Sequence, residues 1–341
     1  MAGIQLTFSA LDLTRTRFAF SPLWEVVMSY RALQRPARFA VHLPWLSAAR
    51  VELGTLPLSP MGALIRPSGF VPNFLTPPPS TPLPEFADEL AVMRASDPDL
   101  VRSEVQEAWY GSPLPPAAQV FIDEPGRALR QLSDSLEAYW ERLLAPHWPR
   151  WRALLEDDVL SRARSLALHG PEAMFNTLGP LIRFSGGVLE VQKELCRGGK
   201  PVVSLEDRGL LLIPSAFVWP GVMVILDDPW QPTLSYTPRG VANLWRTAPP
   251  PVSEALGTLL GRGRASVLLG VESPATTSDL ARLLHLAPSS VSEHLSVLRR
   301  SGLVERRPGN GVSGSVGGRG VYYSLSDTGC QLLGLLSDTP N

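Results

Sequence analysis

Hydrophobic positions in the first 245 residues change their spacing part-way along, which predicts helices followed by strands. Residues 4–8 alternate as in a strand, and apolar side chains over residues 126–143 recur at steps of three and four, the period of one helix face. Helices are predicted over residues 22–33, 37–53, 126–143 and 151–169. Six short β-rich runs over residues 182–236, separated by Gly, Pro and Asp, predict an antiparallel sheet. Together these patterns predict an α+β fold.

Two proline-rich stretches interrupt this order. Residues 67–84 are uncharged and contain seven prolines, which favours extended chain over helix or central strand. This stretch also carries Phe70 and Phe74, so we expect it to wrap a surface. A second stretch ends in three consecutive prolines, residues 249–251, which form a short stiff link. We therefore predict one domain over residues 1–245 and a second over residues 252–336.

The second domain has short amphipathic helices followed by two strands. Helices are predicted over residues 253–260 and 264–271. Thr276 and Asp279 have the spacing of a capping box at the start of a third helix. Pro288 suits the first turn of a fourth helix, which Gly302 ends. Two strand-like runs then flank a loop with six glycines in twelve residues. This order of helices and a β-hairpin predicts a winged helix-turn-helix.

The helix over residues 288–300 has one face that is polar and basic. Val291, Leu295 and Leu298 are spaced to face inward. Small hydroxyl side chains let a helix approach DNA closely and can bond to phosphates or base edges. We predict DNA contacts from this face, the end of the helix and the following hairpin: Ser289, Ser290, Ser292, Glu293, His294, Ser296, Arg299, Arg300, Arg306, Arg307 and Arg319.

The members of this set differ in their expected partners. Glu293 would repel phosphates but can accept a bond from the N4 amino group of cytosine. For His294 a phosphate contact is favoured over packing against a neighbouring helix. Arg319 lies at the base of the glycine loop, which is long enough to reach a minor groove. For Arg262 and Arg264 we favour an exposed helix end over a phosphate contact.

Charge and composition confine the predicted interface to a local patch. The 341-residue chain has 31 Lys and Arg against 32 Asp and Glu, so its formal net charge is −1. Between residues 299 and 319, five arginines accompany one acid. Two distant cysteines, Cys196 and Cys330, exclude a disulfide scaffold and favour the cytoplasm. Residues 209–226 carry no charge, but Pro214 and Pro220 argue for two buried strands and against a membrane span.

The C-terminal pattern resembles the winged-helix domain of bacterial ArsR-type repressors. The resemblance rests on "TTSDLARLLHLAPSSVSEHLSVLRRSGLVERR", "GRGVYYSLS" and the glycine-rich loop between them. It implies a dimeric DNA-binding regulator whose recognition helix starts near Pro288. The N-terminal part, including "RFAFSPLWEVVMSYRAL" and "LLLIPSAFVWPGVMVILDDPWQPTLSYTPRGVANLW", resembles a companion domain of such regulators from high-GC bacteria, which has no established activity.

The sequence departs from metal-sensing members of that family, which carry paired cysteines near the DNA-binding helices. A lone thiol at Cys330 cannot build a metal site by itself, so we expect no metal and no cofactor. Asp227 and Asp228 are expected to serve a turn before Pro229. Eight tryptophans precede residue 241, and we expect most to pack in the core and a few to line an effector pocket: Trp24, Trp45, Trp109, Trp140, Trp148, Trp151, Trp219 and Trp230.

These observations predict a cytoplasmic transcription regulator, a repressor that reads a palindromic operator as a homodimer. The N-terminal domain is expected to sense a small-molecule effector or to dimerise. It is not expected to be an enzyme, because His42, His147 and His169 are scattered and no nucleophile or phosphate-loop motif is present. Two alternatives stay open: a winged helix that binds protein, and an N-terminal enzyme tethered to DNA.

Overall fold

The computed structural model describes residues 3–54, 56–193, 202–245, 251–308 and 321–337. It divides into two compact units. The N-terminal unit comprises Met1–Pro146 and Asp158–Pro238, and the C-terminal unit comprises His147–Asp157 and Arg239–Asn341. The mixture of helices and strands confirms the predicted α+β class. The predicted boundary lies at residues 246–251, whereas the last segment of the C-terminal unit begins at Arg239. That unit also includes His147–Asp157, from the middle of the chain.

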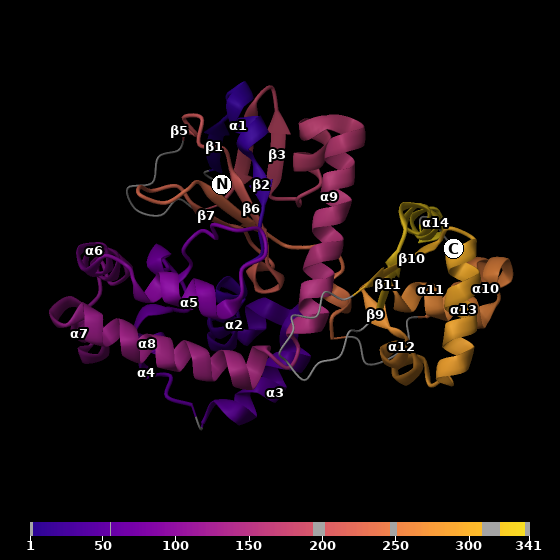
Figure 1. Cartoon of the computed structure of the whole chain (residues 1–341), viewed down its shortest axis with the longest axis horizontal. Coiled ribbons are helices and arrows are strands. Elements are labelled where there is room, and N and C mark those ends of the chain that lie inside the picture. Colours follow the sequence, from indigo (N-terminus) through magenta and orange to yellow (C-terminus); the bar gives the residue numbers. More distant parts are fainter. Residues whose placement is uncertain (1–2, 55, 194–201, 246–250, 309–320, 338–341) are drawn as a thin grey trace. The chain divides into compact units, whose positions relative to one another are not determined.

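Helices form the larger part of the N-terminal unit, and those between residues 22 and 139 gather on one side of its strands (Figure 1). Several of them begin with a proline in the first turn, where the missing N–H is not needed. The α-helices are α1 (Ala10–Arg15), α2 (Pro22–Gln34), α3 (Leu43–Leu53), α4 (Ser59–Leu64), α5 (Phe86–Arg94), α6 (Pro98–Ala108), α7 (Pro116–Asp123), α8 (Pro125–Tyr139) and α9 (Trp148–Asn176). They are accompanied by the 3-10 helices η1 (Pro36–His42), η2 (Asn73–Leu75) and η4 (Ala216–Val218) and by a π-helical turn, η3 (Trp140–Leu144). α9 crosses the division between the units and is kinked at Gly170, just before Pro171.

The strands of this unit form two four-stranded sheets, in the orders β3-β4-β1-β5 and β2-β6-β8-β7. Their bounds are β1 (Gly3–Thr7), β2 (Arg17–Phe18), β3 (Ile182–Ser185), β4 (Val188–Gln192), β5 (Val202–Ser204), β6 (Leu211–Pro214), β7 (Met223–Ile225) and β8 (Thr233–Tyr236). All six predicted β-rich runs are strands. β6 and β8 are buried at every position, as expected for central strands covered on both faces.

The prediction of one antiparallel sheet is wrong. β1 pairs with β4 in antiparallel and with β5 in parallel, and β6 pairs in parallel with both β2 and β8. The physical reason is that β1 and β2, the first strands of the chain, each enter a sheet built from residues about 180 to 200 positions later. In the second sheet β8 also inserts between β6 and β7 and runs parallel to β6. Alternating burial reveals a strand but carries no information about the direction of its neighbours.

Most predicted core positions are buried. The proline-rich stretch packs into the unit, where Val71, Phe74 and Leu75 are at most 3% exposed. Among the tryptophans, Trp24, Trp45 and Trp151 are fully buried, and the remaining five are half-buried. The uncharged run at residues 209–226 forms β6, η4 and β7. Within the described residues, every helix is too short or too polar to cross a bilayer.

Three buried glutamates in the N-terminal unit accept bonds from backbone N–H groups. Glu25 accepts from Ala216 (2.7 Å), Glu89 from Leu23 (2.9 Å) and Glu104 from Phe74 (2.8 Å). Burial raises the pKa of Glu25 to about 7 and that of Glu89 to about 8, against the N–H bonds, which lower it. These carboxyl groups hold loops and helix starts together, which is a structural role.

The Glu25→Gln substitution is expected to flatten the pH dependence of stability. The folded protein keeps the Glu25 proton between pH 4.5 and about 7, where the unfolded chain releases it. Stability therefore falls as pH rises through this window, by about 1.4 kcal/mol for each pH unit and ~3 kcal/mol in total. Chemical denaturation from pH 4.5 to 8 measures the slope, with the exposed Glu107→Gln as control. An unchanged slope in Glu25→Gln would contradict the prediction.

Buried His42 contributes the opposite slope. Its Nε2 lies 2.9 Å from the carbonyl oxygen of Ala216, the residue whose N–H bonds to Glu25. Burial lowers the pKa of His42 to about 4. The stability that depends on neutral His42 is present above about pH 6.5 and is lost as pH falls towards 4. The wild-type curve therefore combines the falling contributions of Glu25 and Glu89 with the opposed contribution of His42, and the Glu25→Gln substitution removes one of the falling contributions.

The C-terminal unit has the predicted order of helices and hairpin. Its elements are α10 (Glu254–Leu260), α11 (Arg262–Gly270), β9 (Ala275–Thr276), α12 (Thr277–Leu284), α13 (Pro288–Arg300), β10 (Val304–Pro308), β11 (Val321–Leu325) and α14 (Asp327–Ser337), with the short turn η5 (Val241–Asn243) before them. β10, β11 and β9 form a three-stranded sheet in that order. One core joins all of the helices, including Leu256 of α10 and Leu333 of α14.

The first turns of α9 belong to this unit through a cluster of aromatic rings. Trp151 is 1% exposed, and its ring meets that of Trp245 edge-on at 5.5 Å and stacks on His147 at 5.7 Å. Gly240 is held nearby, since its carbonyl accepts a bond from Ser273 Oγ at 2.8 Å. Its φ of +77° and the closeness of Leu154 leave no room for a side chain. This segment therefore packs as part of the C-terminal unit.

Candidate nucleic-acid interface

In the C-terminal unit, a tight turn joins α12 to α13. The predicted capping box is present: the Asp279 N–H donates to Thr276 Oγ1 (3.1 Å), and the Thr276 N–H donates to Asp279 Oδ2 (3.2 Å). His285 ends α12 in a left-handed conformation with φ of 53°, which is uncommon for a residue with a Cβ. The chain reverses there, and α13 begins at Pro288 as predicted.

α13 separates an apolar side from a polar side. Val291, Leu295 and Leu298 are at most 1% exposed and pack into the core of the unit. On the other side, the side chains of Ser289, Ser292, Glu293, Ser296, Arg299 and Arg300 are exposed. Ser290 and His294 are half-buried at the margin. The structure thus brings the predicted hydroxyl and arginine side chains onto one face, while their contacts with DNA stay a prediction.

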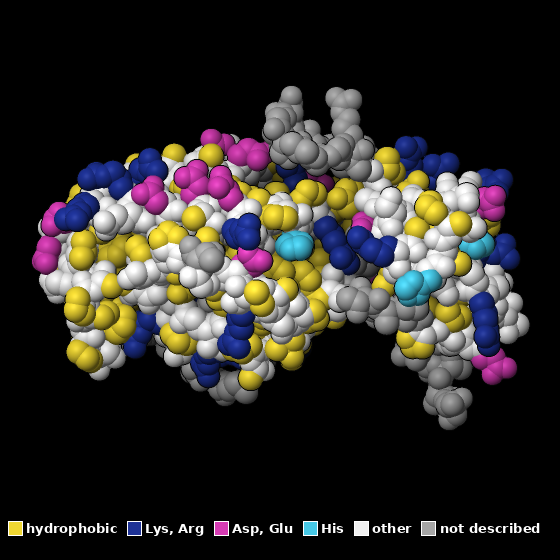
Figure 2. Space-filling view, turned by 90° about the horizontal axis from the view of Figure 1, so that it is seen from below, with side chains coloured by type: hydrophobic (Ala, Val, Ile, Leu, Met, Phe, Trp, Pro, Cys, Tyr) yellow, Lys and Arg dark blue, Asp and Glu magenta, His cyan; other side chains and the backbone are white. Residues whose placement is uncertain are grey.

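The predicted wing is described in part. β10 pairs with β11 in antiparallel, with Arg306 opposite Tyr323 and Arg307 opposite Tyr322. The Arg306 side chain is exposed. The Arg307 side chain, Arg319 and the glycine-rich loop at residues 309–320 lie outside the described residues. In Figure 2 the right-hand part of the molecule, the C-terminal unit, shows more dark-blue arginine side chains than magenta acidic ones.

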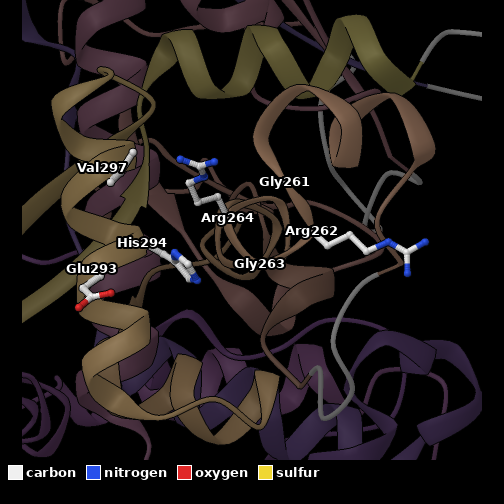
Figure 3. A pocket seen from close by; sticks show the side chains of 7 residues that line it. All are labelled: Gly261, Arg262, Gly263, Arg264, Glu293, His294 and Val297. Atoms are coloured by element: carbon white, nitrogen blue, oxygen red, sulfur yellow. The ribbon is translucent and has the colours of Figure 1, made fainter.

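His294 packs against the first turn of α11. A Cβ added to Gly263 would lie 2.9 Å from His294 Nε2, so the imidazole rests where only a glycine leaves space. Figure 3 shows this ring pointing from α13 toward α11. Packing against a neighbouring helix, the less favoured of the two interpretations of His294, therefore has direct support. A phosphate contact for the same side chain is still a prediction.

The spacing of residues in the sequence did not indicate one charged side chain beside α12, that of Arg150. Arg150, in the first turn of α9, is half-buried in the C-terminal unit, where Asp279, Arg282 and Tyr322 are its electrostatic neighbours. Burial lowers the pKa of Arg150, and the Asp279 carboxylate opposes this. More than 100 residues separate Arg150 from these neighbours, so no local pattern could have identified it.

Metal-ligand candidates do not cluster in the part of the chain that the structure describes. No group of three His, Cys, Asp or Glu side chains there could hold an ion. Cys330 is half-buried, and burial raises the pKa of its thiol. Asp228 forms an ion pair with Arg208 at 2.9 Å, next to the turn at Pro229. Cys196 lies outside the described residues.

Family comparisons agree with this geometry. The model of the bacterial regulatory protein, arsR family, matches residues 268–306, which include α12 and α13. The chain carries an ArsR-family DNA-binding domain. A second model, for a family of unknown function (DUF5937), matches residues 96–241 of the N-terminal part. Neither a curated protein nor a solved structure matches the chain. With its ArsR-family domain, the protein is a DNA-binding transcription regulator with an N-terminal region of unknown function.

Proposed function

We propose that the protein is a repressor that binds a palindromic operator as a homodimer. Each α13 enters a major groove and each wing follows the neighbouring backbone, as two-fold symmetric winged helices do. The observation that carries this proposal is the exposed polar face of α13, which opposes the buried Val291, Leu295 and Leu298. Its serines are small enough to let the helix approach base edges.

The partner chemistry follows from the side chains on this face. Ser289, Ser292 and Ser296 offer hydroxyls to bases or phosphates, and Glu293 suits a cytosine amino group. Arg299, Arg300 and Arg306 supply the salt-dependent part of the affinity. Within the described residues, none of these three arginines forms an ion pair with an acid of the chain. Their charge is therefore available to phosphates.

Selection of bound fragments tests the proposal. The purified full-length protein is mixed with genomic fragments of its source organism, and the bound fragments are sequenced. We expect an enriched site with two inverted half-sites, and repression of a reporter that carries this site. If nothing is enriched and binding to DNA shows no salt dependence, the winged helix would serve a protein partner and the proposal would fail.

The homodimer is proposed to form through α10 and α14. Both helices share the core of the C-terminal unit, yet Leu259 of α10 is 60% exposed and Leu335 of α14 is 75% exposed. Apolar side chains so exposed suit an interface between two copies. A second copy is the proposed occupant because a palindromic site needs two reading helices.

The double variant Leu259→Glu with Leu335→Glu is expected to be monomeric, because two carboxylates would be buried in each half of the interface. Light scattering after size-exclusion chromatography measures the mass. Leu168→Glu, at a leucine 65% exposed in α9, is the matched control and should leave the dimer intact. A dimeric double variant together with a monomeric control would assign dimerisation to the N-terminal unit.

We propose that the N-terminal unit binds an effector or a partner, works in the cytoplasm and has no catalytic activity. The buried carboxyls of Glu25, Glu89 and Glu104 support this, because each is engaged by backbone N–H groups. A bound effector would act by binding one conformation of the protein more tightly than another, where the two conformations differ in their affinity for DNA. A screen of small molecules for release of the selected fragment tests this part. If none releases it, an architectural or dimerising role remains.

A further inference from the structure

A hollow of about 280 Å³ lies beside the reading helix, between the first turn of α11 and the middle of α13. Its lining comprises Gly261, Arg262, Gly263, Arg264, Glu293, His294 and Val297. Figure 3 shows Arg264 and His294 directed into the space between the two helices. In the same view, the Glu293 carboxylate and the Arg262 guanidinium point away from them. The groups that face the hollow are therefore one guanidinium and one imidazole.

A hydrogen bond orients the exposed guanidinium, and packing holds the imidazole. Arg264 Nε donates to the carbonyl oxygen of Leu260 at 2.6 Å, which anchors the guanidinium at one end and leaves its two terminal nitrogens. The His294 ring is held against Gly263, where a Cβ would lie 2.9 Å from its Nε2. The imidazole is thus in place before any ligand arrives, and the bond to Leu260 directs the exposed guanidinium beside it.

The charge of Arg264 is not neutralised by the chain. In the described ranges, neither Arg262 nor Arg264 forms an ion pair, although several surface arginines elsewhere do, such as Arg142 with Glu52 at 2.5 Å. A guanidinium presents donors in a planar fork that matches the oxygens of a phosphate. The hollow also adjoins the polar face of α13, because Glu293 lines the hollow and is one of the exposed residues of that face. A duplex seated on α13 would bring its backbone to this edge.

We propose that this hollow binds a phosphate group of the DNA backbone at the edge of the groove that α13 enters. Arg264 is the main hydrogen-bond donor to this phosphate, and the His294 ring forms one side of the hollow. The inference rests on the proposed DNA binding and adds a contact outside the recognition helix and wing. It reverses the expectation that Arg264 is only an exposed helix end. Arg262, which points away, is the internal control.

The test compares Arg264→Ala with Arg262→Ala, using fluorescence anisotropy of a labelled duplex of mixed sequence over a series of salt concentrations. In the proposed homodimer Arg264→Ala removes two phosphate contacts, one in each copy, and at about 0.9 per contact this makes the slope of log affinity against log salt shallower by about 1.8. We expect this decrease, and roughly fivefold to tenfold weaker binding, for Arg264→Ala. Arg262→Ala should keep most of the wild-type slope. Thermal unfolding of both variants excludes a folding defect.

The outcomes separate the two proposals. If the wild type binds the duplex with a steep salt dependence and Arg264→Ala has the same slope, the hollow is not a phosphate site, while the proposed function stands. Equal losses in both variants would indicate general charge and would also overturn the site. If wild-type binding has no salt dependence, the proposed function itself fails.

A second arm identifies the source of the phosphate. Inorganic phosphate is titrated into the full-length protein without DNA, and binding is followed by isothermal titration calorimetry. If the site serves the DNA backbone, the rest of the duplex is needed for affinity and no binding is expected at millimolar phosphate. Binding of free phosphate that Arg264→Ala abolishes would assign the hollow to a free anion and would overturn the assignment to DNA.

Discussion

Replacing Trp151 by alanine is expected to destabilise the C-terminal unit by ~3–5 kcal/mol, because a large buried ring leaves a cavity that its surroundings fill only in part. Trp151 is 1% exposed and meets Trp245 edge-on at 5.5 Å. A loss of this size is comparable with the whole stability of many domains. DNA affinity should fall with the folded fraction, although Trp151 lies far along the chain from the recognition helix.

Chemical denaturation followed by circular dichroism measures this loss, and Trp148→Ala is the matched control. Trp148 lies one turn earlier in α9 and is half-buried, so its loss should be clearly smaller. Denaturation of a fragment spanning residues 239–341 is a second measurement, since it lacks α9 and should be destabilised in the same way. A Trp151→Ala variant as stable as Trp148→Ala would show that the first turns of α9 do not belong to the DNA-binding unit.

Ser296→Glu is expected to weaken operator binding by about 100-fold without lowering stability. Ser296 is exposed near the centre of the polar face of α13, between Ser292 and Arg300. A carboxylate there would meet phosphates and base acceptors, and individual contacts in a protein–DNA interface are worth about 1–3 kcal/mol each. Glutamate is also a good helix former, so the helix itself should be unaffected.

Anisotropy with the selected fragment measures the affinity, and Gln131→Glu is the matched control. It adds the same charge at an exposed position of α8 in the other unit and should leave binding within about twofold of wild type, since it removes no contact with DNA. Ser296→Ala separates the hydroxyl from the added charge and should cost less than Ser296→Glu. If Ser296→Glu binds like the control, α13 is not the helix that enters the groove.

Much of the DNA-binding domain was predictable because its signals are local. The capping box at Thr276 and Asp279, the proline at the start of α13 and the spacing of Val291, Leu295 and Leu298 all act within one or two helical turns. Such interactions depend on residues three to seven positions apart, which the sequence displays directly. The same reasoning placed the polar face of α13 correctly and identified all six β-rich runs as strands.

The arrangement of distant segments could not be predicted in this way. Whether β1 pairs in parallel with β5, and whether α9 contributes Trp151 to the C-terminal unit, depends on contacts between residues about 90 to 200 positions apart. The position of Arg264 beside His294 likewise depends on how α11 packs on α13. Periodicity shows which side of an element is apolar, but not which other element covers it.

The amino-acid sequence was therefore sufficient for the order of the helices, the two hairpin strands and the polar face of α13, since caps, turns and apolar spacing are local. The mixed sheets, the buried roles of Glu25 and His42 and the membership of residues 147–157 emerged only once the chain had folded. Their common cause is that desolvation and long-range packing act on groups that are neighbours in space without being neighbours in sequence.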